Sequence, residues 1–268
     1  MSAADLGVLG AGSILPRDGY GCAGYVLFAG GAPRPGAEAG EVTLLDLGPG
    51  SVRALAAMGV SLAGVRRVVL SHFHPDHCLD LFALAFARRS PRLGAPAPIE
   101  LVGPVGLRAL LAEAPATFGG WARDPNARVT EVELDAGERG LFRAGSLTFR
   151  CTRNGHASTM TTLSWRVDAD AGWSLLYTGD TNEDERVSAL GRGVDLFVAE
   201  CSFPEEEAAP NHLTPASAAR LAASAGAKRL LLSHFYPSND PQAARERASL
   251  GFDGPVEIAR DGSVHRIA

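Results

Sequence analysis

Length, composition and charge are those of an ordinary α/β enzyme. The chain has 268 residues, of which 46% are hydrophobic and 21% charged, which suits one globular domain over residues 1–268. The net charge of −5 argues against a broad surface that tracks nucleic-acid phosphates, and no apolar stretch is long enough to cross a bilayer.

Short strands and helices alternate along the whole chain. In the first half, strands are expected at 6–9, 25–28, 42–45, 68–70, 99–102 and 129–132, and helices at 52–58, 79–88 and 106–113. In the second half, strands are expected at 147–152, 162–167, 174–177, 196–199, 229–232, 256–258 and 264–267. Helices are expected at 215–225 and 242–249, the first with Thr214 as N-cap and Pro215 in its first position. The pattern alone predicts a mixed α/β domain.

A dense group of metal-ligand side chains follows the strand at 68–70. His72, His74, Asp76 and His77 lie within six residues, and the chain has only seven histidines. We expect Pro75 to prevent a helix from running through this segment, which places the group on a loop at the end of the strand. Imidazole and carboxylate are donors that zinc accepts. A polar loop whose histidines only cap a helix is the alternative, and the density of histidines argues against it.

Three more donors stand at the C-terminal ends of predicted strands, where a sheet would gather them at one edge. They are His156, Asp180 and His234. Singly, a Gly-Asp pair usually marks a turn and a Ser-His pair a structural histidine. Together with the first group, they favour a metal site.

These residues, in this order, resemble the metallo-β-lactamase superfamily over nearly the whole chain. The strand and turn at 44–50 resemble the segment that precedes the family's first helix. Within the superfamily the nearest likeness is to the ribonuclease Z type and its short phosphodiesterase relatives, and it rests on residues 9–12, 198–203 and 212–215. The resemblance implies an α/β fold built as a four-layer αβ/βα sandwich.

The resemblance also implies two divalent metal ions. One is bound by His72, His74 and His156, the other by Asp76, His77 and His234, and Asp180 bridges them. Zinc is expected first, with manganese or iron as alternatives. The reaction it implies is hydrolysis through a metal-bridging hydroxide. Asp76 counts among the catalytic residues as well as the ligands, and His212 with Glu200 supplies the general acid.

The substrate stays open between two classes of hydrolase. A phosphodiesterase is favoured, because His212 and Glu200 extend the site in the ribonuclease Z manner. An acyl hydrolase, such as a lactonase, thioesterase or β-lactamase-like enzyme, would use the same metals without needing His212. A scaffold without turnover is a third alternative, disfavoured because all seven ligands are kept.

Ribonuclease Z commonly carries a long basic arm between the positions of His156 and Asp180, and here residues 157–179 leave room for one hairpin only. We therefore expect a small molecule or a short nucleotide as the phosphodiester, with no extended nucleic acid and no membrane as partner. A homodimer is an open alternative.

Several other features are expected to be structural. Gly10-Ala11-Gly12 lacks the third glycine of a dinucleotide site, and Pro16 interrupts the helix that should follow. The basic run 88–92 is expected to be a solvated loop rather than a substrate contact. For the aromatic segment 117–121, a mobile lid and an ordinary cluster under a loop are equal alternatives. His265 matches no ligand motif and should be dispensable.

The residues 1–5 show no secretory signal, and the four cysteines show no paired spacing, so we expect a cytoplasmic protein with free thiols. They are Cys22, Cys78, Cys151 and Cys201. Cys78 follows a candidate ligand, but a buried structural thiol is favoured over a role beside the metal.

Overall fold

Two mixed β-sheets lie face to face at the centre of the molecule. The computed structural model describes residues 4–33 and 40–268, and within them each sheet has seven strands. The first sheet has the order β14 (Val264–Arg266), β1 (Asp5–Gly10), β2 (Gly24–Phe28), β3 (Val42–Leu47), β4 (Val65–Val69), β5 (Ile99–Pro104) and β6 (Ala127–Val132). The second has the order β13 (Val256–Ile258), β12 (Leu230–Ser233), β11 (Leu196–Glu200), β10 (Ser174–Tyr177), β9 (Leu163–Ala169), β8 (Leu147–Arg153) and β7 (Arg139–Ala144).

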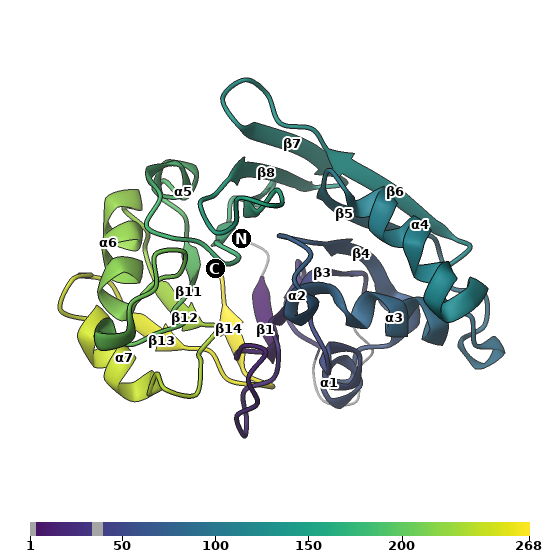
Figure 1. The fold of residues 1–268 in the computed structure, drawn as a ribbon, viewed down its shortest axis with the longest axis horizontal. Helices are drawn as coiled ribbons and strands as arrows, with labels where there is room; N and C mark the ends of the chain where they lie inside the picture. The colour runs from purple at the N-terminus through teal and green to yellow at the C-terminus, as the bar shows by residue number, and fades with distance from the viewer. Residues whose placement is uncertain (1–3, 34–39) are drawn as a thin grey trace.

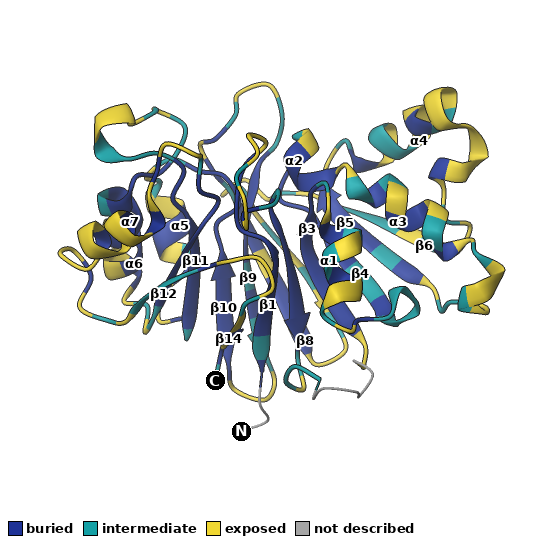
Figure 2. Cartoon of the chain, turned by 90° about the horizontal axis from the view of Figure 1, so that it is seen from below, coloured by how far each residue is buried: buried dark blue, intermediate teal, exposed yellow. Residues whose placement is uncertain are grey.

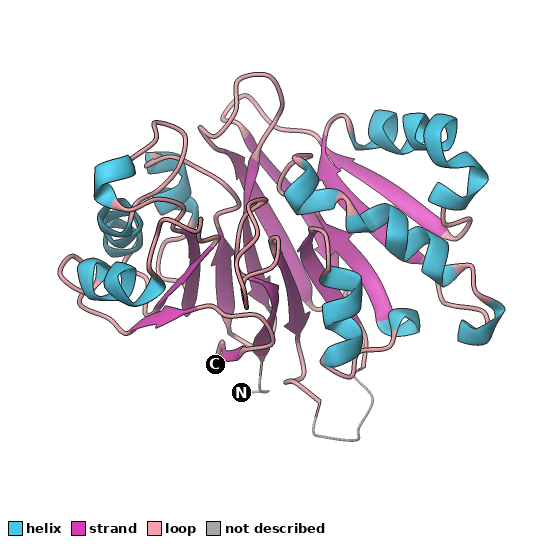
Figure 3. Ribbon diagram, turned by 60° about the horizontal axis from the view of Figure 1, so that its bottom comes forward, coloured by secondary structure: helices cyan, strands magenta, loops and turns pink. Residues whose placement is uncertain are grey.

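Helices cover the outer face of each sheet (Figures 1 and 3). The first sheet carries α1 (Ser51–Ala57), α3 (Asp80–Arg88) and α4 (Leu107–Phe118), and the second carries α5 (Glu185–Leu190), α6 (Pro215–Ala225) and α7 (Pro241–Ala248). A four-residue helix, α2 (Pro75–Cys78), follows β4, and 3₁₀ turns span Leu62–Gly64, Pro91–Leu93, Gly119–Ala122 and Glu205–Glu207. The predicted four-layer αβ/βα sandwich is confirmed.

The apolar residues explain this layering. Trp165 and Phe149 are fully buried in a core between the two sheets, and Phe197, in the same apolar cluster, lies on the helix side of the second sheet beside Gly191 at the end of α5. A second core, which includes Leu44 and Leu84, lies between the first sheet and its helices. The central strands of both sheets are dark blue in Figure 2, while the outer helices carry many exposed residues. Each fully buried large apolar side chain contributes about 1.5–3 kcal/mol, and strands covered on both faces need continuous apolar runs.

Helix α6 begins and ends where the sequence predicts. The Thr214 side chain accepts a hydrogen bond from the backbone N–H of Ser217, and the Ser217 hydroxyl accepts one from the backbone N–H of Thr214, which completes a capping box. Pro215 takes the first helical position. Gly226 ends the helix in the left-handed conformation. No helix among residues 4–33 and 40–268 is both long and apolar enough to span a bilayer.

The prediction that the whole group lies on a loop is wrong for Asp76 and His77, although no helix runs through the segment 72–77. Pro75 is instead the first residue of α2, a position that has no intrahelical partner for its missing N–H, so proline is tolerated there. Asp76 and His77 therefore stand on a helical turn, with His74 as its N-cap.

The prediction of a solvated basic loop is wrong for Arg88. Its side chain is buried at the end of α3, where it pairs with Asp124 at 2.6 Å and donates to the carbonyls of Leu62 and Ala97. Arg89 is exposed, and its guanidinium lies 5.1 Å from the ring centre of Trp121.

The aromatic segment 117–121 is not a loop. Phe118 is the last residue of α4 and Trp121 lies in the 3₁₀ turn that follows. Their rings pack on α3, against Phe82 at 5.8 Å and Phe86 at 5.7 Å respectively. The structure therefore favours the ordinary cluster over the lid. An apolar cavity of about 260 Å³ under α3 and α4 is lined by none of the candidate metal ligands.

Candidate metal centre

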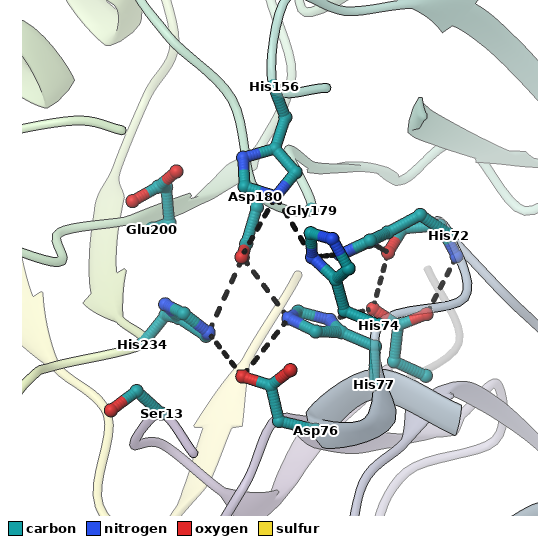
Figure 4. A network of polar contacts seen from close by, with 12 residues as sticks. Ser13, His72, His74, Asp76, His77, His156, Gly179, Asp180, Glu200 and His234 are labelled. Atoms are coloured by element: carbon teal, nitrogen blue, oxygen red, sulfur yellow. Dashed lines mark hydrogen bonds and ion pairs between the residues drawn. The ribbon is translucent and has the colours of Figure 1, made fainter. Parts of the chain in front are cut away.

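The candidate ligands meet where the C-terminal ends of strands from the two sheets lie close together. His72, His74, Asp76 and His77 follow β4 of the first sheet. His156, Asp180 and His234 follow β8, β10 and β12 of the second sheet. Strands β10, β11 and β12 are parallel, and β8 runs in the same direction because one antiparallel strand, β9, separates it from β10. The three ligands therefore stand at the same end of the sheet. All seven predicted ligands are thus brought together (Figure 4).

The first cluster consists of three imidazoles and one carboxylate oxygen. Nδ1 of His74 lies 2.9 Å from Nε2 of His72 and 3.1 Å from Nε2 of His156. Oδ2 of Asp180 lies 3.8 Å from the same His156 nitrogen. Atoms that bind one zinc ion tetrahedrally, each about 2.0–2.1 Å from it, are about 3.3 Å apart. The spacing of these donors fits a shared metal ion.

The second cluster has the same dimensions on the other side of Asp180. Oδ1 of Asp180 lies 3.3 Å from Nε2 of His77 and 3.4 Å from Nε2 of His234, and Oδ2 of Asp76 lies 3.6 Å from the His234 nitrogen. These atoms of His77, His234 and Asp180 are buried and have no hydrogen-bond partner. Buried polar atoms without a partner are costly, and a divalent cation bound among these atoms would satisfy them.

Gly179 explains how Asp180 reaches this position. Its φ of 57° is left-handed, and a Cβ at this position would lie 2.8 Å from the Cβ of Ser71. Only glycine fits both demands, so the chain can turn directly after β10 toward the other candidate ligands. As a result Asp180 presents one oxygen to each cluster.

A buried carboxylate that the sequence analysis did not assign supports both clusters. Oδ2 of Asp46 accepts hydrogen bonds from His77 Nδ1 at 2.7 Å, Ser71 Oγ at 2.6 Å and the Tyr177 hydroxyl at 2.5 Å. Ser71 Oγ also lies 2.9 Å from Nδ1 of His72. One carboxylate therefore orients a ring of each cluster, which is how outer groups hold metal-binding histidines. A charged residue inside the apolar run 44–47 was the available signal.

Asp46 and His234 adopt a left-handed backbone, with φ of 54° and 57°. Such conformations cost non-glycine residues on the order of 1–3 kcal/mol and concentrate at functional sites, although aspartate and histidine tolerate them better than most residues.

His212 and Glu200 stand beside the second cluster. Nδ1 of His212 lies 3.0 Å from Oε1 and 3.1 Å from Oε2 of Glu200, the last residue of β11. A ring nitrogen of His212 lies within 4.8 Å of donor atoms of Asp180 and His234. Glu200 also accepts from the backbone N–H of Thr181 at 2.7 Å and from the Ser202 hydroxyl, so it is fixed in place.

The electrostatics suit cation binding. Burial and neighbouring imidazoles hold the pKa of His72 well below its ordinary value, which keeps it in the neutral form that binds metals. Burial alone would raise the pKa of Asp180, but His234 and His77 hold it well below its ordinary value. Burial alone would lower the pKa of His77, but Asp180 and Asp46 raise it well above its ordinary value. This position between two carboxylates thus favours a positive charge.

A four-layer αβ/βα sandwich with two adjoining histidine and aspartate clusters at its strand ends defines a metal-dependent hydrolase of the metallo-β-lactamase fold. Residues 43–235 match the family described as the beta-lactamase superfamily domain, and the chain belongs to that family.

Similar proteins agree with this assignment. An uncharacterized protein of Mycobacterium leprae is 31% identical over 97% of this chain and 87% of its own length. A ribonuclease Z of Mycobacterium bovis is 28% identical over 87% of this chain and 89% of its own length. Among solved structures, the metallo-beta-lactamase fold protein YhfI from Bacillus subtilis superposes with a TM-score of 0.82 at 23% identity, covering 99% of this chain and 100% of that one.

Proposed function

We propose that this protein is a dinuclear metal-dependent phosphodiesterase. His72, His74 and His156 would hold one divalent ion, Asp76, His77 and His234 the other, and Asp180 would bridge them. The donor spacing and the unpartnered buried atoms support this ligand set. Nitrogen and oxygen donors without thiolate fit zinc, with manganese and iron as alternatives. Such ions, when bound, activate water near neutral pH and stabilise charge on phosphoryl oxygens.

The observation that carries the choice of a phosphodiester is the pairing of His212 with Glu200. Glu200 holds Nδ1 of His212, which leaves Nε2 of the ring to serve a substrate atom. Burial lowers the pKa of His212, but the Glu200 carboxylate outweighs burial and raises it to about 9. In the metal-free protein His212 therefore carries a proton at neutral pH, and a proton on Nε2 is one that the ring can deliver to the leaving oxygen of a diester. An alkoxide leaving group needs such help.

The residues between His156 and Asp180 support a small or flexible substrate. They form β9 and β10, which are joined by a tight turn in which Gly172 N–H bonds to the carbonyl of Ala169. The chain thus passes between these two ligands without the basic arm that the resemblance to ribonuclease Z would lead one to expect. We propose a small molecule or a short nucleotide as the diester.

A panel of substrates on one zinc-loaded preparation tests this proposal. Bis-p-nitrophenyl phosphate, p-nitrophenyl acetate, a γ-lactone and nitrocefin would be compared at equal enzyme concentration. We expect the diester to have the highest kcat/KM, with activity lost on chelation and restored by zinc. Faster turnover of the ester, lactone or nitrocefin would favour an acyl hydrolase instead. Specific 3′ cleavage of a precursor tRNA at nanomolar enzyme would contradict the small substrate.

A further inference from the structure

Two stacked aromatic rings stand beside His212 and His234. Phe203 lies three residues beyond β11 and Tyr236 two residues beyond His234, and their ring centres are 4.5 Å apart at an angle of 30°. The imidazole of His212 lies 5.5 Å from the ring of Phe203 and 6.1 Å from that of Tyr236. The ring of His234 lies 5.9 Å from Tyr236. The pair therefore forms a border of the site on the side of the proposed general acid.

The backbone holds this pair in a fixed position. The Tyr236 N–H donates to the carbonyl of Ser202 at 3.1 Å, and its own carbonyl accepts from the N–H of Asn239 at 3.0 Å in a turn. The side chain of Asn239 in turn donates to the carbonyl of Cys201 at 2.8 Å. The segments that carry the two rings are thus tied to each other and to the ends of β11 and β12.

Both rings are only half-buried, unlike the neighbouring Phe235, which is fully enclosed in the core. A purely structural aromatic pair would gain from complete burial, because the apolar contribution scales with the area removed from water. Here part of each ring is left at the surface next to groups that would perform the chemistry.

We propose that Phe203 and Tyr236 form a stacking platform for a flat ring on the leaving alcohol of the substrate. This inference rests on the proposed function. A general acid must come within hydrogen-bond distance of the leaving oxygen, so the group attached to that oxygen must lie close to His212. Aromatic rings interact at centre distances of 4.5–7 Å, and the distances from the imidazole to both rings fall in this range.

The substrate class that follows is a phosphodiester whose leaving alcohol carries a nucleobase or an aryl group. Every base presents a flat π-face, so such a platform would accept the class without selecting one base. Selectivity for a flat leaving group over a branched aliphatic one is the property that the two rings would add to the metal centre.

Two diesters with leaving groups of nearly equal acidity test the platform. Methyl 4-chlorophenyl phosphate has a flat leaving group, and methyl hexafluoroisopropyl phosphate has a branched one. Base–aromatic stacking is worth about 5- to 100-fold per ring. We expect Y236L and F203L each to lower kcat/KM for the aryl diester by this factor, mainly through KM, and to change the fluoroalkyl diester less than twofold. Y236F keeps the ring and should therefore keep the wild-type ratio of kcat/KM between the two diesters.

Matched controls come from the aromatic cluster on α3. F118L and W121L remove rings that pack on Phe82 and Phe86, and they should leave the ratio of the two diesters unchanged. Equal losses on both diesters in Y236L and F203L, with bound metal intact, would overturn the platform alone. A wild-type enzyme that hydrolyses neither diester would overturn the proposed function and the platform with it.

Discussion

Asp180 connects the two halves of the proposed centre through its two carboxylate oxygens. Oδ1 faces His77 and His234 of the second cluster, whereas Oδ2 faces His156 of the first. Replacing a peripheral ligand removes one donor from one cluster, but replacing Asp180 removes a donor from both. The side chain is therefore the most sensitive test of a dinuclear site.

We expect D180A and H74A to contain fewer than two metal ions per chain and to lose nearly all turnover, because each lacks a direct donor. Metal content is measured by mass spectrometry on the same samples that are assayed. H265A is the control. His265 is buried against Glu257, 2.6 Å away, so the variant should melt earlier yet retain its metal and its kcat. Full activity of exhaustively chelated protein would refute the metal mechanism.

His212 allows a test of proton delivery that does not depend on metal content. General acid catalysis typically contributes about 10²–10⁴ in rate. H212A should lose about this much kcat on an alkyl phosphodiester and keep both metals. The loss should shrink sharply when p-nitrophenolate leaves, because this group needs little protonation.

E200Q keeps the shape of the side chain that holds His212 but removes its charge. E200Q should lose less kcat than H212A, and its loss should likewise shrink when p-nitrophenolate is the leaving group. If H212A loses equal activity on both substrates, or loses metal, His212 has another role.

At the scale of elements, the prediction from the sequence was more accurate for the strands that carry the ligands than for the contacts around those ligands. The strands before Asp180 and His234 are short apolar runs, as strands covered on both faces require, and the strand before His156 alternates between apolar and polar residues. The edge strand β7 was missed because its residues alternate between exposed and half-buried without a strong apolar pattern. The short helix α5 was missed for the same reason, since six residues give no clear period.

The supporting groups around the clusters could not be predicted from the sequence. Asp46 of β3 is 31 positions from His77, which follows the neighbouring strand β4, and 131 positions from Tyr177, which only the packing of the second sheet on the first brings close. The hydroxyl of Ser202 lies near His212 and His234, which are 10 and 32 positions away in the sequence. Ligand types are visible in a sequence because the chemistry restricts them, whereas their hydrogen-bond partners depend on tertiary geometry.

The turn after β10 gives a prediction at this scale. G179A should lower the melting temperature and displace Asp180, because the new Cβ overlaps Ser71 as well as requiring a left-handed backbone. Metal content should fall along with stability. The melting temperature and the bound metal are measured on one preparation.

Gly145, in the turn between β7 and β8, supplies the matched control. Its φ of 59° is also left-handed, but a Cβ there would meet nothing within 4 Å. G145A should therefore lose only about 1–2 kcal/mol, the cost of the backbone conformation, and keep its metal. If both variants lost equal stability and retained metal, the close approach at Gly179 would not position Asp180.

At the scale of the whole molecule, the site depends on how the two sheets are held against each other. Near the ligands, Trp165 of β9 donates to the carbonyl of Leu70 at 3.0 Å, and the Tyr25 hydroxyl of β2 lies 2.6 Å from Oγ of Ser233. Because each cluster takes donors from both sheets, any sliding between the sheets would separate the donors within each cluster.

At the outer strands, a histidine–glutamate pair joins the sheets. His265 of β14, in the first sheet, pairs with Glu257 of β13, in the second. Arg229 adds a second link by contacting Glu257 at 3.2 Å and donating to the carbonyl of Ile267 at 3.0 Å. The hydrogen bond from His265 lowers the pKa of Glu257 below its ordinary value, although burial opposes the shift.

A depressed pKa makes this link depend on pH. The stabilisation is fully present above the ordinary pKa of glutamate, about 4.3, and is lost as pH falls through the lower folded-state value. The pair is partly exposed, so about 1 kcal/mol is expected, or roughly 2–4 °C in melting temperature for a chain of this size. E257Q should therefore melt earlier than wild type by this amount at pH 7, and the gap should close in acid.

Metal-free protein is compared at each pH, because acid also releases metal from histidine. E113Q, which changes an exposed carboxylate on α4, should show no gap at either pH. A gap for E257Q that persisted undiminished in acid would mean that Glu257 stabilises the sheets by packing, without its charge.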